Sequence, residues 1–203
     1  MAIAKQIDLD FHKWGGARKG AGRKLNKGKR NVPHVVRPPL ATRFPVHVTL
    51  RVRSHVFNLR SQRCFSALKQ AFREGRDRFG FGLVHFSVQG NHIHLIVEAK
   101  GAQSLSKGMQ GLTIRMARRL NLVMKRRGSV FADRYHAHIL KSPREVRNAV
   151  AYVLGNHKHH AMQQGRVLNI NFVDKFCSAT AAADLTLAPR TWLLIQTCRH
   201  LRL

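Results

Sequence analysis

The fold of this chain is decided by the segment Gln89-Gly90-Asn91-His92-Ile93-His94-Leu95-Ile96-Val97-Glu98. Gly90-Asn91 is typical of a two-residue hairpin turn, and the residues after it follow the pattern of a β-strand. Because side chains in a strand alternate between faces, His92 and His94 project to one side and Ile93 to the other. Two imidazoles placed in this way are a ready pair of metal ligands.

The segment before the turn, residues 81–88, also alternates and predicts the partner strand of this hairpin. The Gly90-Asn91 loop sets the register. On one face it pairs Val88 with Ile93, Phe86 with Leu95 and Val84 with Val97; on the other it pairs Gln89 with His92, Ser87 with His94 and His85 with Ile96. We therefore expect a core on the first face and the histidines on the second, more polar face.

The composition indicates a polyanionic partner. The 203 residues include 37 Lys and Arg against 9 Asp and Glu, which gives a net charge of +28 and a pI near 11.8. Nucleic acid is the first partner to consider. A membrane surface is the alternative, but the basic residues are spread along the chain and no long apolar run is present to span a bilayer. The polar start of the sequence is unlike a signal peptide, which predicts a cytoplasmic, nucleoid-associated protein.

Two residue types narrow the chemistry. Acids are so scarce that only Glu98 and Asp133 lie near motif-like segments, which disfavours nucleases that place three carboxylates around two metal ions. Cysteines are three in number, and their spacing fits neither a zinc site nor a disulfide framework. We expect them to be reduced and mostly buried.

Residues 1–44 are predicted to be a basic, disordered arm. Residues 11–45 contain ten Lys and Arg and no acid, and the glycine-rich run 15–24 cannot bury apolar surface. We expect this arm to follow DNA phosphates through Arg18, Lys19, Arg23 and Lys24, with Arg23 suited to a minor groove. A solubilising or linker tail is the alternative.

Residues 45–162 are predicted to form one α+β domain. Strands are expected at 47–52 and 130–140, flanking a helix at 61–79, the hairpin and a helix at 105–123. The first helix is expected to bury Phe65, Leu68, Phe72 and Phe79. This order, strand, helix, strand, strand, helix, strand, is the split βαβ arrangement of a ferredoxin-like domain with an antiparallel sheet. Residues 163–203 are predicted to be a C-terminal extension. A short helix or strand is expected at 191–198, and a short strand is considered at 168–173.

The second of these helices combines an apolar stripe with arginines. The stripe predicts packing, and the arginines predict either a solvated face or a surface that binds the DNA backbone. The candidate DNA-binding residues here and just downstream are Arg115, Arg118, Arg119, Arg126 and Arg134.

A further helix with a clear start follows the last strand. Ser142 is a candidate N-cap, Pro143 suits the first position and Glu145 completes a capping box. Tyr152 and Asn156 lie four residues apart on this helix and therefore share one side of it. Two imidazoles with the amide oxygen of Asn156 leave positions on a divalent ion, Mg²⁺ or Mn²⁺, for phosphate oxygens. Tyr152 is then the natural nucleophile, because a phosphotyrosine keeps the energy of the broken DNA bond.

At these residues the chain resembles the single-tyrosine HUH transposases of the IS200 type, and most closely the relatives associated with repetitive extragenic palindromes. The matching stretches are Pro45-Val-His-Val-Thr-Leu-Arg-Val52, His85-Phe-Ser-Val-Gln-Gly-Asn-His-Ile-His-Leu-Ile-Val-Glu98, Phe131-Ala-Asp-Arg-Tyr135 and Pro143-Arg-Glu-Val-Arg-Asn-Ala-Val-Ala-Tyr-Val-Leu-Gly-Asn156.

The resemblance implies an HUH endonuclease fold with an extra C-terminal helix that carries the nucleophile. It implies metal-dependent cleavage of single-stranded or hairpin DNA, a 5′-phosphotyrosine on Tyr152 and a free 3′-OH, with His92, His94 and Asn156 holding the metal. Relatives often have Gln as the third ligand. They are dimers with shared sites, which leaves open a homodimer and action of Tyr152 within or across subunits. The tail near residue 176 differs from relatives, which leaves open a degenerate copy.

The sequence leaves several alternatives open. Tyr135 competes with Tyr152 as nucleophile, but its place in a predicted strand favours packing. His136 and His138 form a second His-x-His pair, interpreted as structural or DNA-contacting, although His138 lies within possible reach of the same metal. The alternative function is a catalytically inactive or domesticated DNA- or RNA-binding module. A histidine-rich hydrolase of small phosphoesters fits poorly with the charge of +28.

Overall fold

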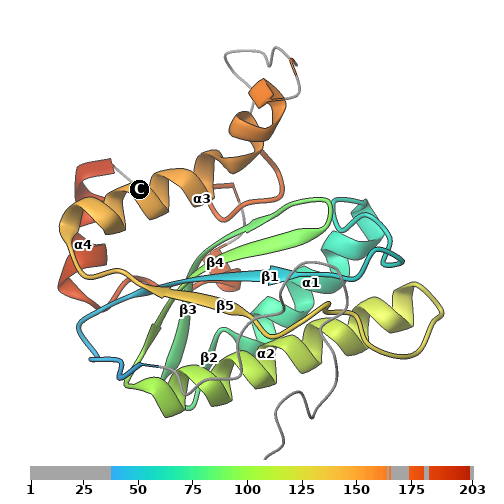
Figure 1. Cartoon of the computed structure of the whole chain (residues 1–203), viewed down its shortest axis with the longest axis horizontal. Coiled ribbons are helices and arrows are strands. Elements are labelled where there is room, and N and C mark those ends of the chain that lie inside the picture. The colour runs from blue at the N-terminus through green and yellow to red at the C-terminus, as the bar shows by residue number, and fades with distance from the viewer. Residues whose placement is uncertain (1–37, 164, 166–173, 181–182, 202–203) are drawn as a thin grey trace, which may run out of the picture. The chain divides into compact units, whose positions relative to one another are not determined.

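A five-stranded antiparallel sheet in the order β2-β3-β4-β1-β5 forms the centre of the domain (Figure 1). The computed structural model describes residues 38–163, 165, 174–180 and 183–201, with only the backbone for 158–163. Its strands are β1 (Val46–Arg51), β2 (Asp77–Arg78), β3 (Phe81–Val88), β4 (His92–Ala99) and β5 (His136–Ile139). The edge strand β2 was not predicted. The other four strands have the order expected of the split βαβ arrangement, so the predicted α+β fold is confirmed.

The β3–β4 hairpin has the predicted register next to its turn and departs from it further along. Val88 pairs with Ile93, Ser87 with His94 and Phe86 with Leu95. Beyond His85 a β-bulge intervenes, so that Leu83 and not Val84 lies opposite Val97. The predicted partner of Val97 is therefore wrong. The bulge places one extra residue in β3, and Val84 joins the core on the histidine-bearing face.

The main core lies between one face of the sheet and two helices, α1 (Gln62–Gly75) and α2 (Ala102–Val123). Inward-facing residues of β1, β3 and β4 meet the apolar sides of both helices there, including Leu68, Phe72, Met109 and Leu112. The predicted helical stripes account for this packing, because residues three and four apart lie on one side of a helix.

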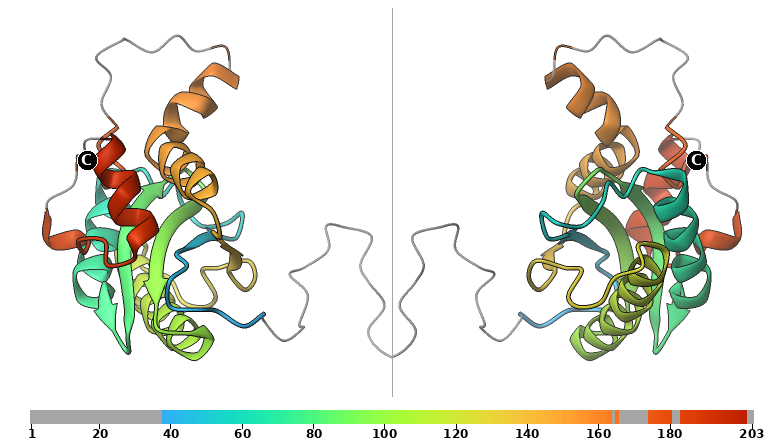
Figure 2. Two further views of the ribbon diagram at one scale, coloured as in Figure 1. Left: turned by 90° about the vertical axis from the view of Figure 1, so that its left-hand side faces the viewer. Right: turned by 90° about the vertical axis from the view of Figure 1, so that its right-hand side faces the viewer.

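The opposite face of the sheet is covered by α3 (Pro143–Gln163) and α4 (Trp192–Leu201) (Figure 2). A smaller core forms here around Val84, Ile96, Val150 and Leu194. The predicted capping box begins α3: the Glu145 amide donates to Ser142 Oγ at 3.2 Å, and the Ser142 amide donates to Glu145 Oε2 at 3.0 Å.

Helix α4 is held at its start by one buried carboxylate. Glu98 accepts hydrogen bonds from the amides of Arg190 and Thr191 and from the Thr191 hydroxyl, at 2.7–3.0 Å. The short helix η1 (Ala183–Leu185) precedes this point. Residues 191–198, predicted as helix or strand, are helical from Trp192, and the strand considered at 168–173 lies outside the described residues.

The helix predicted at 61–79 ends earlier than expected, and the strand predicted at 130–140 starts later. Phe79 is 64% exposed because α1 ends at Gly75 and Phe79, with φ of 57°, lies in the turn between β2 and β3. The strand predicted at 130–140 is only β5. Residues 130–135 form a loop, joined to the sheet by a bridge between Val52 and Phe131. The cysteines are free and buried as predicted, and within the described residues no helix is long and apolar enough to cross a membrane.

Candidate active site

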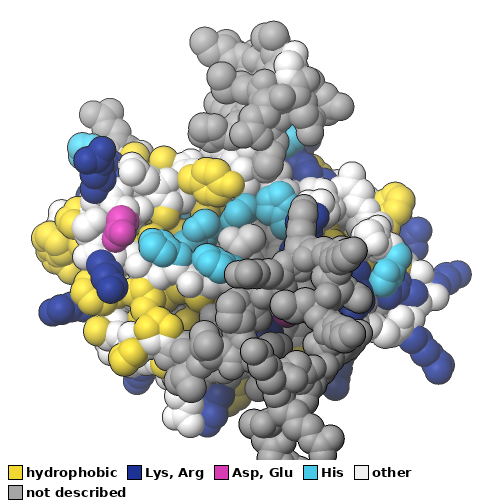
Figure 3. Space-filling view, in the orientation of Figure 1, with side chains coloured by type: hydrophobic (Ala, Val, Ile, Leu, Met, Phe, Trp, Pro, Cys, Tyr) yellow, Lys and Arg dark blue, Asp and Glu magenta, His cyan; other side chains and the backbone are white. Residues whose placement is uncertain are grey.

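Histidines gather on the sheet face that α3 covers. Side chains alternate along each strand, so His92 and His94 of β4 face the same side as His47 of β1 and His136 and His138 of β5. Figure 3 shows the resulting band of histidine side chains across this face. His94 is buried, 5% exposed, whereas the β5 histidines are exposed.

Tyr152 lies against the predicted histidine pair of its own chain. Its ring meets the ring of His94 edge to face, with centroids 5.3 Å apart, and the ring of His47 at 6.1 Å. The His92 and His94 rings are themselves 4.9 Å apart. Tyr152 remains 38% exposed. One chain thus brings the predicted nucleophile and the predicted imidazole pair together.

Asn156 lies one helical turn beyond Tyr152 and is fully buried. Val150 shares a buried cluster with Ile96, and Tyr152 contacts His94, so α3 runs along β4 toward His92. Neither Nδ2 nor Oδ1 of Asn156 has a hydrogen-bond partner among the described residues. A buried amide without a partner is costly, which makes this side chain a good candidate for a ligand.

The two imidazoles have their Nδ1 atoms engaged by neighbouring side chains. His92 Nδ1 lies 2.8 Å from Asn91 Oδ1. His94 Nδ1 lies 3.1 Å from His47 Nε2 and 3.3 Å from Thr49 Oγ1. A partner that holds one nitrogen of an imidazole directs the opposite nitrogen toward a bound metal, so Nε2 is the expected metal-binding atom in both rings.

These residues fit a divalent cation. Two Nε2 atoms and one amide oxygen are suitable donors for Mn²⁺ and, less well, for Mg²⁺. No three His, Cys, Asp or Glu side chains converge on a metal position in the described part of the chain. An amide such as that of Asn156 would therefore have to complete the set with His92 and His94.

Sequence reasoning missed two residues of this face. His47 is half-buried, and its pKa is lowered to about 4 by burial and by the nearby His138 and His136. It is therefore neutral at neutral pH. Arg51 is exposed and directly opposite His92 in the β1–β4 pairing, so it places a positive charge beside the pair. The alternation of residues 47–52 was the available signal, but the partner strand of this segment was not readable locally.

The two residues that the sequence left as alternatives, Tyr135 and His138, are placed differently from Tyr152. Tyr135 precedes β5 in a loop, not in a strand, and packs against the main core on the other face of the sheet. His138 is exposed and lies 3.8 Å from Glu145, at the start of α3. The interpretation of Tyr135 as a packing residue agrees with this placement.

The arginines predicted to bind DNA are scattered. Arg115 and Arg119 lie on α2, across the sheet from Tyr152; Arg115 donates to the Gly111 carbonyl, and Arg119 pairs with Glu74. Arg118 also lies on α2 and is exposed, Arg126 follows that helix, and Arg134 precedes β5. Their contact with DNA stays a prediction. The arm residues Arg18, Lys19, Arg23 and Lys24 lie outside the described residues.

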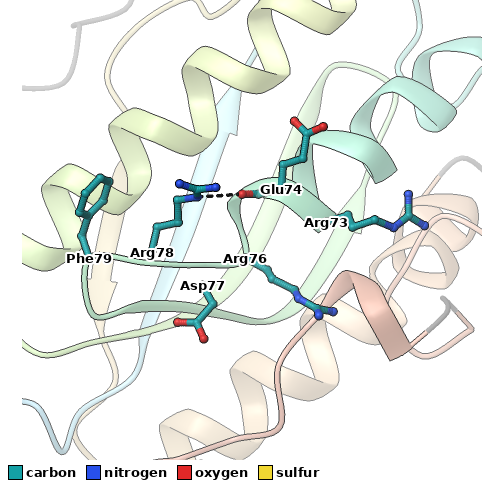
Figure 4. A pocket seen from close by; sticks show the side chains of 6 residues that line it. All are labelled: Arg73, Glu74, Arg76, Asp77, Arg78 and Phe79. Atoms are coloured by element: carbon teal, nitrogen blue, oxygen red, sulfur yellow. Dashed lines mark hydrogen bonds between the residues drawn. The ribbon is translucent and has the colours of Figure 1, made fainter.

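A separate hollow of about 470 Å³ lies between the end of α1 and β2 (Figure 4). Its lining residues are Arg73, Glu74, Arg76, Asp77, Arg78 and Phe79. Both acids have cationic partners outside the hollow, Arg119 for Glu74 and Arg190 for Asp77. None of the predicted catalytic residues lines this hollow, so the candidate active site is the histidine face beneath α3.

Comparison with known proteins places this chain in a family. Residues 41–156 match the family model described as Transposase IS200 like. The fold is similar to a solved REP-associated tyrosine transposase bound to a REP hairpin, with a TM-score of 0.54, 14% identity, and coverage of 78% of this chain and 93% of that one. A second solved structure, described as a putative transposase from Deinococcus radiodurans, gives a TM-score of 0.41 and 15% identity, with coverage of 70% of this chain and 100% of that one. Comparison with curated protein sequences gave no match.

The matched region spans β1 through Asn156 and so contains the complete histidine face and Tyr152. The class that these findings define is a DNA transposase domain on a split βαβ fold. More particularly, the chain belongs to the IS200-like transposase family.

Proposed function

We propose that this protein is a metal-dependent endonuclease and strand transferase for single-stranded DNA, with Tyr152 as its nucleophile. The observation that carries the proposal is the contact of the exposed Tyr152 ring with His94 within one chain, at 5.3 Å between centroids. A nucleophile on a helix and a ligand pair on a strand then face one phosphodiester. The proposal therefore has Tyr152 act at the histidines of its own subunit.

The chemical step follows from these groups. The phenolic oxygen of Tyr152 gives up its proton and attacks the phosphorus, and the bond from phosphorus to the 3′ oxygen breaks. The 3′ oxygen takes up a proton and leaves as a free 3′-OH, while the 5′ phosphate stays on Tyr152. Attack by another 3′-OH reverses this step and joins the new strand, because the phosphotyrosine keeps the bond energy.

His92, His94 and Asn156 are the proposed holders of the cation. When bound there, Mg²⁺ or Mn²⁺ supplies Lewis acidity at the scissile phosphate. His92 and His94 would present Nε2, since Asn91, His47 and Thr49 engage the Nδ1 atoms. The unpartnered buried amide of Asn156 supports its role as the third ligand.

Hairpin or palindromic DNA is the proposed substrate. A net charge of +28 supports a polyanion, and a protein of similar fold is described as bound to a REP hairpin. Arg51 is the proposed phosphate contact beside His92, because it is exposed on the same face. A homodimer remains compatible with this scheme.

The test is a covalent adduct with DNA. A single-stranded oligonucleotide that carries a hairpin should yield an SDS-stable protein–DNA band with Mn²⁺, less or equal amounts with Mg²⁺, and none with a chelator. Tyr152→Phe should abolish the band, and the matched control Tyr135→Phe should retain it. A mixture of the His94→Ala protein and the Tyr152→Phe protein should stay inactive if each subunit uses its own tyrosine with its own histidines.

Other outcomes decide against the proposal. An adduct that survives Tyr152→Phe and disappears with Tyr135→Phe would reassign the nucleophile. Salt-sensitive hairpin binding that a chelator leaves unchanged, with no adduct on any hairpin tested, would favour the non-catalytic binding module.

A further inference from the structure

We propose that His47 is a positioning residue that fixes the tautomer and orientation of His94, so that Nε2 of His94 is directed to the metal. The inference rests on the proposed function for the metal site itself, because His94 is assigned as a ligand only there. The hydrogen-bond arrangement itself is independent of catalysis.

The geometry defines a close pair across neighbouring strands. His47 on β1 and His94 on β4 have rings stacked at 5.2 Å between centroids, tilted by 28°. His47 Nε2 lies 3.1 Å from His94 Nδ1, within hydrogen-bond distance. His94 is buried and His47 half-buried, so water competes little for this contact.

The direction of the hydrogen bond follows from the chemistry of imidazole. A neutral imidazole has one N–H donor and one lone-pair nitrogen. If Nε2 of His94 is to coordinate, its proton must be on Nδ1, which then donates to Nε2 of His47. His47 must in turn carry its own proton on Nδ1. Both rings are thereby assigned the Nδ1–H tautomer.

Thr49 is a second, weaker acceptor for the same proton. Its Oγ1 lies 3.3 Å from His94 Nδ1, slightly farther than His47 Nε2. A hydroxyl rotates freely, whereas the stacked imidazole also fixes the plane of the His94 ring. We therefore assign the main positioning role to His47 and a supporting role to Thr49.

The first experiment measures the tautomer directly in the metal-free, full-length protein. Long-range ¹H–¹⁵N spectra of the imidazoles, assigned with His94→Ala, should show His94 protonated at Nδ1. His47→Leu removes the acceptor at similar volume, and the Nε2–H form of His94 should then rise. Thr49→Val should cause a smaller change. An unchanged tautomer in His47→Leu would overturn the proposal.

The second experiment measures Mn²⁺ binding without DNA by calorimetry. Loss of a partner that orients a metal-bound histidine typically weakens metal affinity by about 10–100-fold, and we expect a loss in this range for His47→Leu. His47→Gln offers an amide oxygen as acceptor and should recover most of the affinity. His200→Gln, a change at an exposed histidine on α4, is the control that should bind as the wild type does.

These results separate the two proposals. If His94→Ala binds Mn²⁺ as tightly as the wild type, the metal site of the proposed function is wrong, and His47 orients no ligand. If the wild type binds through His94 and His47→Leu binds equally well, only the role of His47 is wrong. Should His47→Leu fail to fold, His47→Met, which also lacks a strong acceptor, takes its place in both measurements, with the same expected and contradicting results.

Discussion

His85 is a half-buried ionisable residue that lies outside the candidate active site. Its Nε2 lies 3.6 Å from Cys198 Sγ on α4, and its Nδ1 lies 3.3 Å from Ser178 Oγ. Burial lowers the pKa of His85 to about 4, and burial together with the charge of Glu98 raises the pKa of the Cys198 thiol. Both groups are therefore neutral near pH 7, and this pair is not an activated thiolate.

The shift at His85 predicts an acid-sensitive fold. As the pH falls below about 6.5, the unfolded chain takes up a proton at His85 that the folded chain accepts only near pH 4. The difference lowers the free energy of unfolding by about 2 kcal/mol at pH 5. Urea unfolding of His85→Gln should show a smaller loss between pH 7 and pH 5 than the wild type. His200→Gln should show the wild-type loss, and an equal loss in both variants would contradict this origin.

Local sequence was sufficient for the central residues of the candidate site. Strand alternation placed His92 and His94 on one face, and helical spacing placed Asn156 one turn from Tyr152. Local sequence could not identify His47 as a neighbour of His94, because that contact depends on which strands pair across the sheet. Whether the ring of Tyr152 reaches the histidines was also a tertiary question, which only the packing of α3 answers.

The helices and strands were predicted correctly where the hydrophobic periodicity was uninterrupted. The predictions were wrong where the chain bends. The hairpin register was correct as far as His85. The β-bulge beyond it, which brings Val84 into the cluster with α3 and α4, has no signature in the local sequence. Phe79 had the right spacing for α1, but the turn before β3 takes it out of the helix. The strand predicted at 130–140 was too long. Its first apolar residues, Val130 and Phe131, pack on the core from a loop and not from a strand.

Two glycines on α2 should respond oppositely to alanine. A Cβ at Gly108 would lie 2.3 Å from Cβ and Cγ of Phe81 on β3, so helix and strand would have to separate. A Cβ at Gly111 meets only the movable end of Arg115, at 3.0 Å. We expect Gly108→Ala to lower the free energy of unfolding by about 1–3 kcal/mol. Gly111→Ala should raise it by up to about 1 kcal/mol through helix propensity. Urea unfolding measures both; a stabilised Gly108→Ala would show that α2 packs less closely.

The whole molecule carries its positive charge on both sides of the sheet. Arg51 lies on the histidine face, and Arg118 is exposed on α2 at the other. A helix is about 10 Å across, and charges are largely screened beyond about 8 Å at physiological salt. A short single strand at the histidine face should therefore sense Arg51 much more than Arg118, although both contribute equally to the net charge.

This separation of faces predicts different salt dependences for two equal changes of charge. For a short single-stranded oligonucleotide, each phosphate contact contributes about 0.7 to the slope of log affinity against log salt. Arg51→Gln should reduce the slope by about 0.7 and weaken binding at low salt, because it removes the proposed phosphate contact beside His92. Arg118→Gln should leave the slope unchanged. Fluorescence anisotropy over a salt series measures both. Equal effects of the two variants would mean that the charge acts as a uniform field, and a larger effect of Arg118→Gln would place the bound strand on α2, away from Tyr152.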